Sequence, residues 1–299
     1  MRFSDLARLS LLAALWGGSF AFMRVAVPTL GPIWLAESRV AIAFAVLFAL
    51  ALARRDVPAF RSRWRGFLVV GAVNSALPFT LFCFAEQFLA ASTAAILNAT
   101  SPFFGAIVAA VWLKAPLKPS TLAGMALGLA GVIFLVGWHA ERQDAMTWMA
   151  MLACLVAALC YGIASVYAKA RMTGAPSFAI ALYSQLTAAM VLAPALPFAQ
   201  APVAVTPLVA ANVLALGVAS TAVAYLLYFR LISDIGPARA LSVTFLIPLF
   251  GVLWGFLFLG EPVTATMLAG GALIVAGTWL ATRSSGPARR DRAVHEASR

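Results

Sequence analysis

Polar residues that lie inside long apolar segments are the first candidates for a binding function in this sequence. Asn98 precedes Pro102 by four residues, and Thr244 precedes Pro248 by the same distance. A proline inside a helix leaves a backbone carbonyl without its helical donor. Each pair is therefore a candidate for binding the polar end of a zwitterion, because a polar group in an apolar environment needs a partner. The alternative interpretation is a packing kink whose polar groups bond to neighbouring helices.

Aromatic side chains at helical spacing form a second candidate set. Thr221 is followed after four and seven residues by tyrosines, and Ser75 is followed by phenylalanines at the same spacing, which places each group on one helix face. Walls of this kind, with a few polar groups among them, suit an apolar ligand. The alternative is ordinary helix packing or lipid contact. The predicted wall comprises Trp16, Phe79, Phe82, Tyr161, Tyr183, Gln185, Tyr225 and Tyr228.

Four charged residues lie near the ends of the first three apolar segments, namely Arg24, Glu37, Arg39 and Glu86. Glu37 and Arg39 are two residues apart, so on a helix they point to nearly opposite faces and each needs another partner. The set predicts either a one-sided ionic gate on the outer side or a static cluster that faces lipid headgroups.

The sequence offers no set of catalytic or metal-ligating residues inside its apolar segments. An intramembrane enzyme would need paired aspartates, a Ser/His couple or metal ligands, and no Asp or His lies inside such a segment. The three cysteines are odd in number and match no metal or redox spacing. We therefore expect no catalytic residue, no metal and no cofactor, which leaves an enzyme as the remote alternative.

The elements that must hold these residues follow from composition. The chain has 299 residues, 63% hydrophobic and 10% charged, whereas a soluble domain carries roughly 25% charged residues. A helix needs about 20 apolar residues to cross a membrane. The composition excludes an ordinary soluble enzyme and predicts an all-α membrane protein with ten transmembrane helices. The predicted helices cover residues 6–27, 33–53, 66–86, 92–112, 120–138, 147–169, 177–198, 208–230, 237–258 and 264–282.

Positive charge is distributed unevenly between alternate loops. Eighteen of the 21 Lys and Arg residues lie in one set of loops and the termini. Because cytoplasmic loops retain positive charge, both termini are predicted to be cytoplasmic in a plasma (inner) membrane. The net charge of +11 does not indicate nucleic acid, because the basic residues lie in short loops and a tail without interleaved aromatics. The expected partners are membrane lipid and a small-molecule substrate, and the sequence is compatible with a monomer.

The chain also contains an internal repeat. A shift of 146 residues aligns 71–135 with 217–281 without a gap, with 13 identities over 90–135. Earlier segments align at a shift of 145, which places Trp16 on Tyr161. Each copy has five predicted helices, an odd number, so the second copy enters the membrane from the opposite side. The predicted domains are a first five-helix repeat over 1–140, an inverted second repeat over 147–282 and a basic tail over 283–299.

Two inverted copies can present one central site to either side of a membrane, as carriers do. The motifs that identify the family are Ala14-Leu15-Trp16-Gly17-Gly18-Ser19, Gly236-Pro237-Ala238, Pro248–Val252 and Leu259–Pro262. Over residues 6–282 the sequence resembles the EamA-type branch of the drug/metabolite transporter superfamily. The first copy departs from the family pattern, since Leu113-Lys114-Ala115-Pro116 stands where the family has a Gly-Glu-Pro-like turn.

The resemblance implies a carrier that exports small apolar or aromatic amino acids, or related metabolites, by alternating access. Organic-cation efflux within the same superfamily is the alternative. That function would need a carboxylate deep in the pathway, and Glu37 and Glu86 are expected near the outer surface. The lack of a chain of acidic and His residues inside the predicted helices favours facilitated export over proton coupling.

Overall fold

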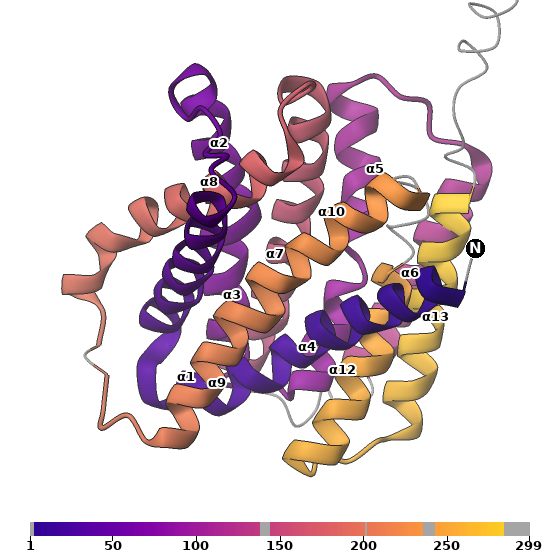
Figure 1. Ribbon diagram of the computed structural model, residues 1–299. Coiled ribbons are helices and arrows are strands. Elements are labelled where there is room, and N and C mark those ends of the chain that lie inside the picture. Colours follow the sequence, from indigo (N-terminus) through magenta and orange to yellow (C-terminus); the bar gives the residue numbers. More distant parts are fainter. Residues whose placement is uncertain (1–2, 138–143, 201, 236–242, 284–299) are drawn as a thin grey trace, which may run out of the picture.

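The computed structural model describes residues 3–137, 144–200, 202–235 and 243–283. Every regular element in these ranges is a helix, as the composition predicts. The first part of the chain forms α1 (Phe3–Ala53), α2 (Trp64–Gly71), α3 (Leu77–Ala85), α4 (Ala91–Asn98), α5 (Ser101–Trp112) and α6 (Pro119–Gly137) (Figure 1). The second part forms α7 (Ala145–Arg171), α8 (Ser177–Leu192), α9 (Pro207–Gly217), α10 (Ala224–Ile235), α12 (Val243–Leu259) and α13 (Ala265–Arg283). The motif at residues 236–238 and the tail from residue 284 lie outside the described residues.

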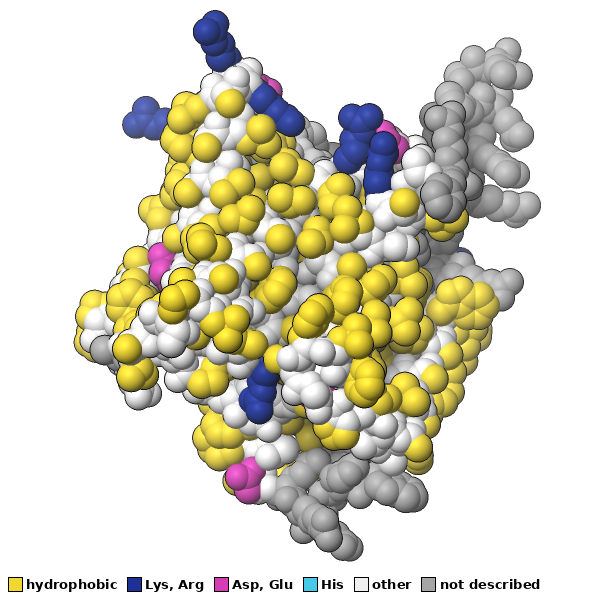
Figure 2. Space-filling view, turned by 60° about the horizontal axis from the view of Figure 1, so that its bottom comes forward, with side chains coloured by type: hydrophobic (Ala, Val, Ile, Leu, Met, Phe, Trp, Pro, Cys, Tyr) yellow, Lys and Arg dark blue, Asp and Glu magenta, His cyan; other side chains and the backbone are white. Residues whose placement is uncertain are grey.

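The helices have the length and composition of a multi-pass membrane protein. Six described helical segments are long and apolar enough to cross a membrane, namely Ser4–Ala53, Arg61–Ala85, Ala91–Trp112, Ala145–Arg171, Ser177–Phe198 and Pro207–Tyr228. Three shorter apolar helices cover Pro119–Leu135, Val243–Leu259 and Ala265–Ala281. Figure 2 shows hydrophobic side chains over most of one face, with most of the Lys and Arg side chains of that face at its upper edge.

A sharp bend in α1 replaces the short loop expected between the first two apolar segments. Gly31 has φ 72° and ψ 167°, in the left-handed region that glycine adopts without steric cost. Pro28 and Pro32 flank it, and both interrupt helical hydrogen bonding. The two arms of α1 therefore run in different directions (Figure 1).

Two apolar segments contain a π-helical turn that the sequence did not predict. The turns cover Ala72–Ala76, between α2 and α3, and Val218–Val223, between α9 and α10. They begin at equivalent positions of the 146-residue shift. In the second turn the Thr221 hydroxyl donates to the carbonyl of Leu216, five residues earlier, at 2.9 Å. Such turns re-aim the polar side chains of a helix and are frequent at functional sites.

The helix predicted over 92–112 is two helices, because the chain breaks at Ala99 and Thr100 between α4 and α5. The break lies before Pro102, which occupies the first turn of α5. A backbone N–H in the first turn of a helix makes no intrahelical hydrogen bond, so proline removes none there. Pro248, in contrast, lies inside α12 without ending that helix. The two Asn/Thr-to-Pro pairs therefore have different backbone surroundings.

Close helix contacts recur at positions that the repeat makes equivalent. A Cβ added to Gly17 in α1 would lie 2.7 Å from the Cβ of Phe250 and 2.9 Å from the nitrogen of Gly251 in α12. A Cβ added to Gly162 in α7 would lie 2.7 Å from the nitrogen of Gly105 and 3.0 Å from the Cβ of Phe104 in α5. Glycine is required at both positions because a neighbouring backbone fills the space that a side chain would need.

Helices α6 and α13 pack against each other along their length at one edge of the molecule (Figure 1). A Cβ added to Gly131 would lie 2.8 Å from the carbonyl oxygen of Gly270, and one added to Gly277 would lie 2.5 Å from that of Gly124. The order of the partners along the two helices is opposite, so the helices are antiparallel. Small residues on both sides allow this close approach.

Candidate functional site

A buried arginine occupies the centre of the candidate site. Arg39 in α1 is 5% exposed, and its guanidinium carbon lies 3.6 Å from the centre of the Phe79 ring in α3. Its Nε donates to the Thr221 hydroxyl at 2.9 Å, and one terminal nitrogen lies 3.6 Å from the sulfur of Met23. The sequence placed Arg39 in an end cluster with Arg24 and Glu37, whereas the structure places it against the predicted aromatic wall.

The bond from Arg39 to Thr221 has a counterpart in the other half of the chain. The shifts of 145 and 146 residues place Arg39 on Ser184 and Thr221 on Ser75. Gln185 in α8 joins these two serines, since its Nε2 donates to the hydroxyl of each at 3.2 Å. Gln185 is fully buried, and its side-chain oxygen has no partner among the described residues. In both halves a polar side chain thus bonds to a hydroxyl of a π-helical turn.

Aromatic contacts connect the two halves in a reciprocal pattern. The ring of Trp16 in α1 lies 5.3 Å from that of Tyr228 in α10. The ring of Tyr161 in α7 lies 6.2 Å from that of Phe82 in α3. These pairs are equivalent under the internal repeat, and each joins one half to the other. The structure therefore brings together seven of the eight predicted wall residues through direct or shared neighbours, namely Trp16, Phe79, Phe82, Tyr161, Gln185, Tyr225 and Tyr228.

Tyr225 links the aromatic wall to a polar residue that the sequence analysis missed. Its ring lies 6.5 Å from that of Trp16 in an edge-to-face arrangement. Its hydroxyl accepts a hydrogen bond from Nδ2 of Asn74 at 2.9 Å. Asn74 lies in the first π-helical turn. Its amide inside an apolar segment was a signal of the kind that identified Asn98, because a buried amide needs partners.

Glu86 is a fully buried carboxylate at the end of α3. Neither of its carboxylate oxygens has a hydrogen-bond partner in the described part of the chain. Arg24 donates to the main-chain carbonyl of Glu86, not to the carboxylate. One oxygen of Glu37 is likewise buried without a partner among these residues. Glu86 is thus enclosed by protein at the end of α3, and its position near the outer surface of the membrane stays a prediction.

The carbonyls near Pro102 are already bonded to neighbouring side chains. The carbonyl of Ala99 accepts a hydrogen bond from the Thr278 hydroxyl of α13 at 2.9 Å. That of Asn98 accepts from Ser101 at 2.6 Å, and the Asn98 side-chain oxygen lies 3.2 Å from the same hydroxyl. These bonds agree with the packing interpretation of the Asn98 and Pro102 pair. In the other pair, Pro248 is buried in α12 and Thr244 is half-buried.

Tyr183 lies apart from the other predicted wall residues. Its ring lies 5.0 Å from that of Phe60 and 5.1 Å from that of Phe67. Its hydroxyl donates to the carbonyl of Pro58, in the loop between α1 and α2. The requirement for a hydroxyl partner is met there, so Tyr183 anchors the basic loop instead of lining the site.

Glu261 is a structural residue whose role the sequence analysis did not assign. Its carboxylate accepts hydrogen bonds from the backbone nitrogen of Ala91 at 2.7 Å and that of Ser92 at 3.0 Å. The Ser92 hydroxyl also donates to it at 2.5 Å. A carboxylate at this position satisfies free N–H groups of the first turn of α4. The Leu-Gly-Glu-Pro run of the second half thereby holds a helix of the first half. The equivalent position in the first half is Ala115, which has no carboxylate and cannot make these bonds.

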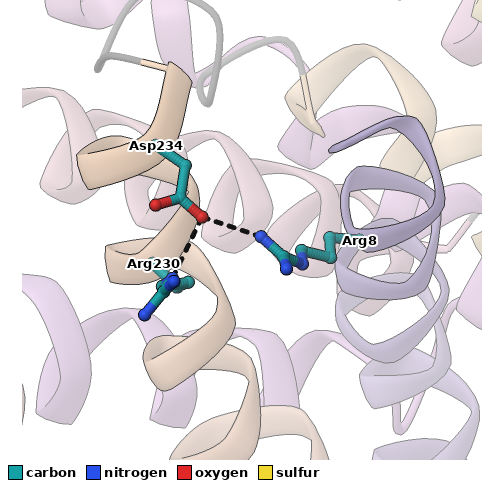
Figure 3. A network of polar contacts seen from close by, with 3 residues as sticks. All are labelled: Arg8, Arg230 and Asp234. Carbon is teal, nitrogen blue, oxygen red and sulfur yellow. Dashed lines mark hydrogen bonds and ion pairs between the residues drawn. The ribbon is translucent and has the colours of Figure 1, made fainter. Parts of the chain in front are cut away.

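An ion-pair network joins α1 to α10 at the end that carries the N-terminus (Figure 3). Asp234 accepts from Arg8 at 2.7 Å and from Arg230, one turn earlier, at 3.0 Å. Hydrogen bonds from Arg230 lower the pKa of Asp234, and Arg8 adds to this effect, so the carboxylate is ionised at neutral pH. The repeat places Phe88 on Asp234, so the equivalent position has no acid.

The described residues hold no group of three or more His, Cys, Asp or Glu side chains placed to bind a metal ion. Cys83, Cys154 and Cys160 are buried thiols.

A groove of about 350 Å³ lies at the bend of α1, lined by Gly31, Thr80 and neighbouring residues. No residue of the predicted wall lines this groove.

Comparison with known proteins decides the family. Residues 7–137 and 148–283 each match the model of the EamA-like transporter family. The chain belongs to this family. The match confirms the resemblance inferred from the motifs. It also makes this EamA-like transporter a multi-pass membrane protein, consistent with its apolar helices.

Several curated relatives of this EamA-like transporter span nearly its whole length. A probable terminal-alkyne amino-acid exporter of Streptantibioticus cattleyicolor is 30% identical over 293 residues, covering 95% of each chain. A probable amino-acid metabolite efflux pump of Salmonella typhimurium is 25% identical, covering 90% of this chain and 92% of its own. An S-adenosylmethionine/S-adenosylhomocysteine transporter of Chlamydia trachomatis is 26% identical over 89% of this chain and 85% of its own.

A crystal structure of 21% identity superposes with a TM-score of 0.67, covering 96% of this chain and all of that chain. At this identity the likeness concerns the fold. It indicates that the helix arrangement described above occurs in a protein of nearly the same length.

Proposed function

We propose that this EamA-like transporter exports small apolar or aromatic amino acids, or related metabolites, by alternating access. The observation that carries the proposal is the buried Arg39 beside two reciprocal aromatic pairs, Trp16 with Tyr228 and Tyr161 with Phe82. A transport site for such substrates needs aromatic walls and a few fixed polar groups. The names of two relatives, an amino-acid exporter and an amino-acid metabolite efflux pump, support the same substrate class.

The proposed architecture is ten membrane spans in two inverted five-helix repeats, over residues 1–140 and 147–282. Two equivalent contacts support it. Gly17 packs against Phe250, and Gly162 packs against Phe104, which the repeat places on Phe250. Reciprocal contacts of this kind are what a pseudo-two-fold axis in the membrane plane produces. The distribution of Lys and Arg supports cytoplasmic termini in the inner membrane.

Alternating access requires that the two ends of the site open in turn. In the conformation described, the network of Arg8, Asp234 and Arg230 ties α1 to α10 at the proposed cytoplasmic end. At the other end Arg24 binds the main chain of Glu86. Export would then proceed by separation of α1 from α10 while substrate enters, followed by separation at the opposite end.

A second candidate is efflux of organic cations. The buried carboxylate of Glu86, without a hydrogen-bond partner in the described residues, is the observation that favours it. An aromatic cation would also gain from the faces of Trp16 and Tyr161 through cation–π attraction. This candidate predicts transport of a permanently charged aromatic cation without transport of amino acids.

Flux measurements in proteoliposomes test both candidates. Labelled phenylalanine, leucine, lysine and tetraphenylphosphonium would be compared, with and without a pH gradient. We expect phenylalanine and leucine to be transported and lysine and the cation to be excluded. Tyr225→Ala should reduce phenylalanine transport, whereas Phe258→Ala serves as the control because Phe258 is 72% exposed. Equal transport by the two variants would contradict the proposed site, and transport of the cation alone would favour the second candidate.

A further inference from the structure

We propose that Arg39 binds the carboxylate, and Glu86 the ammonium group, of one zwitterionic amino-acid substrate. This assignment rests on the function proposed above and names the polar contacts of that site. It follows from three properties of the two side chains: burial, missing hydrogen-bond partners and contacts with neighbouring residues of α1 and α3.

Arg39 is held in place but has donors to spare. A guanidinium has five N–H donors, and hydrogen bonds to Thr221 and Met23 use Nε and one terminal nitrogen. The face of the group rests on the Phe79 ring. No carboxylate within the described part of the chain lies within 4.0 Å of it. The terminal fork, which matches a carboxylate in a two-bond arrangement, is therefore available to a ligand.

Glu86 presents the complementary charge. It is fully buried, and neither carboxylate oxygen has a hydrogen-bond partner among the described residues. A buried carboxylate is costly unless a cation or several donors compensate it. Arg24 lies beside Glu86, but it donates its hydrogen bond to the main-chain carbonyl and not to the carboxylate. A substrate ammonium group would supply the hydrogen-bond donors that the Glu86 carboxylate lacks among these residues.

The two side chains face one neighbourhood. Phe79, on which the Arg39 guanidinium rests, precedes Glu86 by seven residues along α3, so the two positions share one face of this helix. Met23, which contacts Arg39, directly precedes Arg24, which donates to the main-chain carbonyl of Glu86. Arg39 also bonds to Thr221, which lies four residues before Tyr225, and the Tyr161 ring stacks on Phe82, three residues after Phe79. The charged ends of a zwitterion would therefore lie beside the aromatic pairs that receive an apolar side chain. A substrate with only one charge would leave either the terminal fork of Arg39 or the carboxylate oxygens of Glu86 without a hydrogen-bond partner.

Three ligands with the same ring separate the two contacts. L-phenylalanine carries both charges, phenethylamine lacks the carboxylate, and 3-phenylpropionate lacks the ammonium group. We expect the wild-type protein to bind phenylalanine at least about tenfold more tightly than either analogue, the effect of one charge-assisted contact. Binding would be measured as ligand-induced thermal stabilisation of the purified protein, and as competition with labelled phenylalanine in proteoliposomes.

Variants assign each charge to its residue. Arg39→Gln should weaken phenylalanine and 3-phenylpropionate about tenfold while leaving phenethylamine unchanged. Glu86→Gln should weaken phenylalanine and phenethylamine and leave 3-phenylpropionate unchanged. Arg39→Lys keeps the charge without the fork and should lie between the wild type and Arg39→Gln, so it decides the question even if Arg39→Gln does not fold. Arg65→Gln and Asp56→Asn remove the same kinds of charge at exposed positions and serve as controls.

The outcomes separate the assignment from the proposed function. Equal losses for all three ligands in the Arg39 and Glu86 variants would show that these residues are structural, which overturns the assignment while transport by the wild type stands. Equal binding of the three ligands by the wild type would overturn it as well. Absence of both phenylalanine binding and amino-acid flux in the wild type would refute the proposed function, and the assignment with it.

Discussion

Arg39 lies over the ring of Phe79, with the guanidinium carbon 3.6 Å from the ring centre. The two residues come from α1 and α3, and the sequence assigned them to different groups, a charged gate and an aromatic wall. Their contact makes these one site. A cation held on an aromatic face keeps its position and its in-plane donors at the same time.

Replacement of Phe79 by leucine tests this contact. The change keeps apolar volume but removes the ring, so it should cost about 0.5–2 kcal/mol of cation–π attraction and weaken phenylalanine binding about two- to thirtyfold. Binding to the purified variant is the measurement. Phe258→Leu, at a 72% exposed position, should bind like the wild type. An unchanged affinity in Phe79→Leu would show that the ring does not position Arg39.

The close approach of α1 and α12 predicts unequal effects at neighbouring glycines. A Cβ at Gly17 would lie 2.7 Å from that of Phe250, whereas one at Gly18 would lie 3.4 Å from its nearest neighbour, the Trp254 ring. Gly17→Ala should destabilise the protein by about 1–3 kcal/mol, the scale of overpacking, and Gly18→Ala should not destabilise it. Thermal unfolding in detergent compares the two, and a lower midpoint for Gly18→Ala than for Gly17→Ala would contradict the packing described.

The network of Arg8 and Asp234 predicts a reversible block of transport. Cysteines at both positions, joined by a cleavable bifunctional maleimide, should arrest flux, because α1 and α10 would no longer separate at that end. Cleavage of the linker should restore flux. The single-cysteine variants and the wild type, whose three cysteines are buried, control for modification alone. Full flux in the linked protein would rule out an opening between these helices.

The orientation of the chain is tested by thiol labelling. Asp56 lies in the basic loop between α1 and α2, and Gln87 in the loop after α3, and both are exposed. In intact cells an impermeant thiol reagent should label Gln87→Cys and leave Asp56→Cys unmodified. Permeabilised cells should label both. The reverse pattern in intact cells would place the termini outside.

The apolar helices and the family were predictable because each depends on local sequence. Runs of about 20 apolar residues and motifs such as the one containing Trp16 need no knowledge of neighbours. The reciprocal partners of Trp16 and Tyr161 agree with the repeat that was visible in the sequence.

Features that depend on distant partners were not predictable. The donor that satisfies the carbonyl of Ala99 comes from Thr278, 179 residues away. The position of Arg39 depends on Thr221 and Phe79 from two other helices. The π-helical turns have no sequence signature comparable with that of proline, and they turn Asn74 toward Tyr225. Tyr183 met the rule that a buried hydroxyl needs a partner, but the rule does not say where that partner lies.

The glycine contact between α6 and α13 has the symmetry of an interface between two identical subunits. Gly124 meets Gly277 and Gly131 meets Gly270, so equivalent residues exchange places across the contact. A self-complementary surface of this kind has the form of the interface of a symmetric homodimer, here formed within a single chain. The symmetry is broken where Gly128 makes room for Phe103, because the equivalent positions hold Ile274 and Leu249.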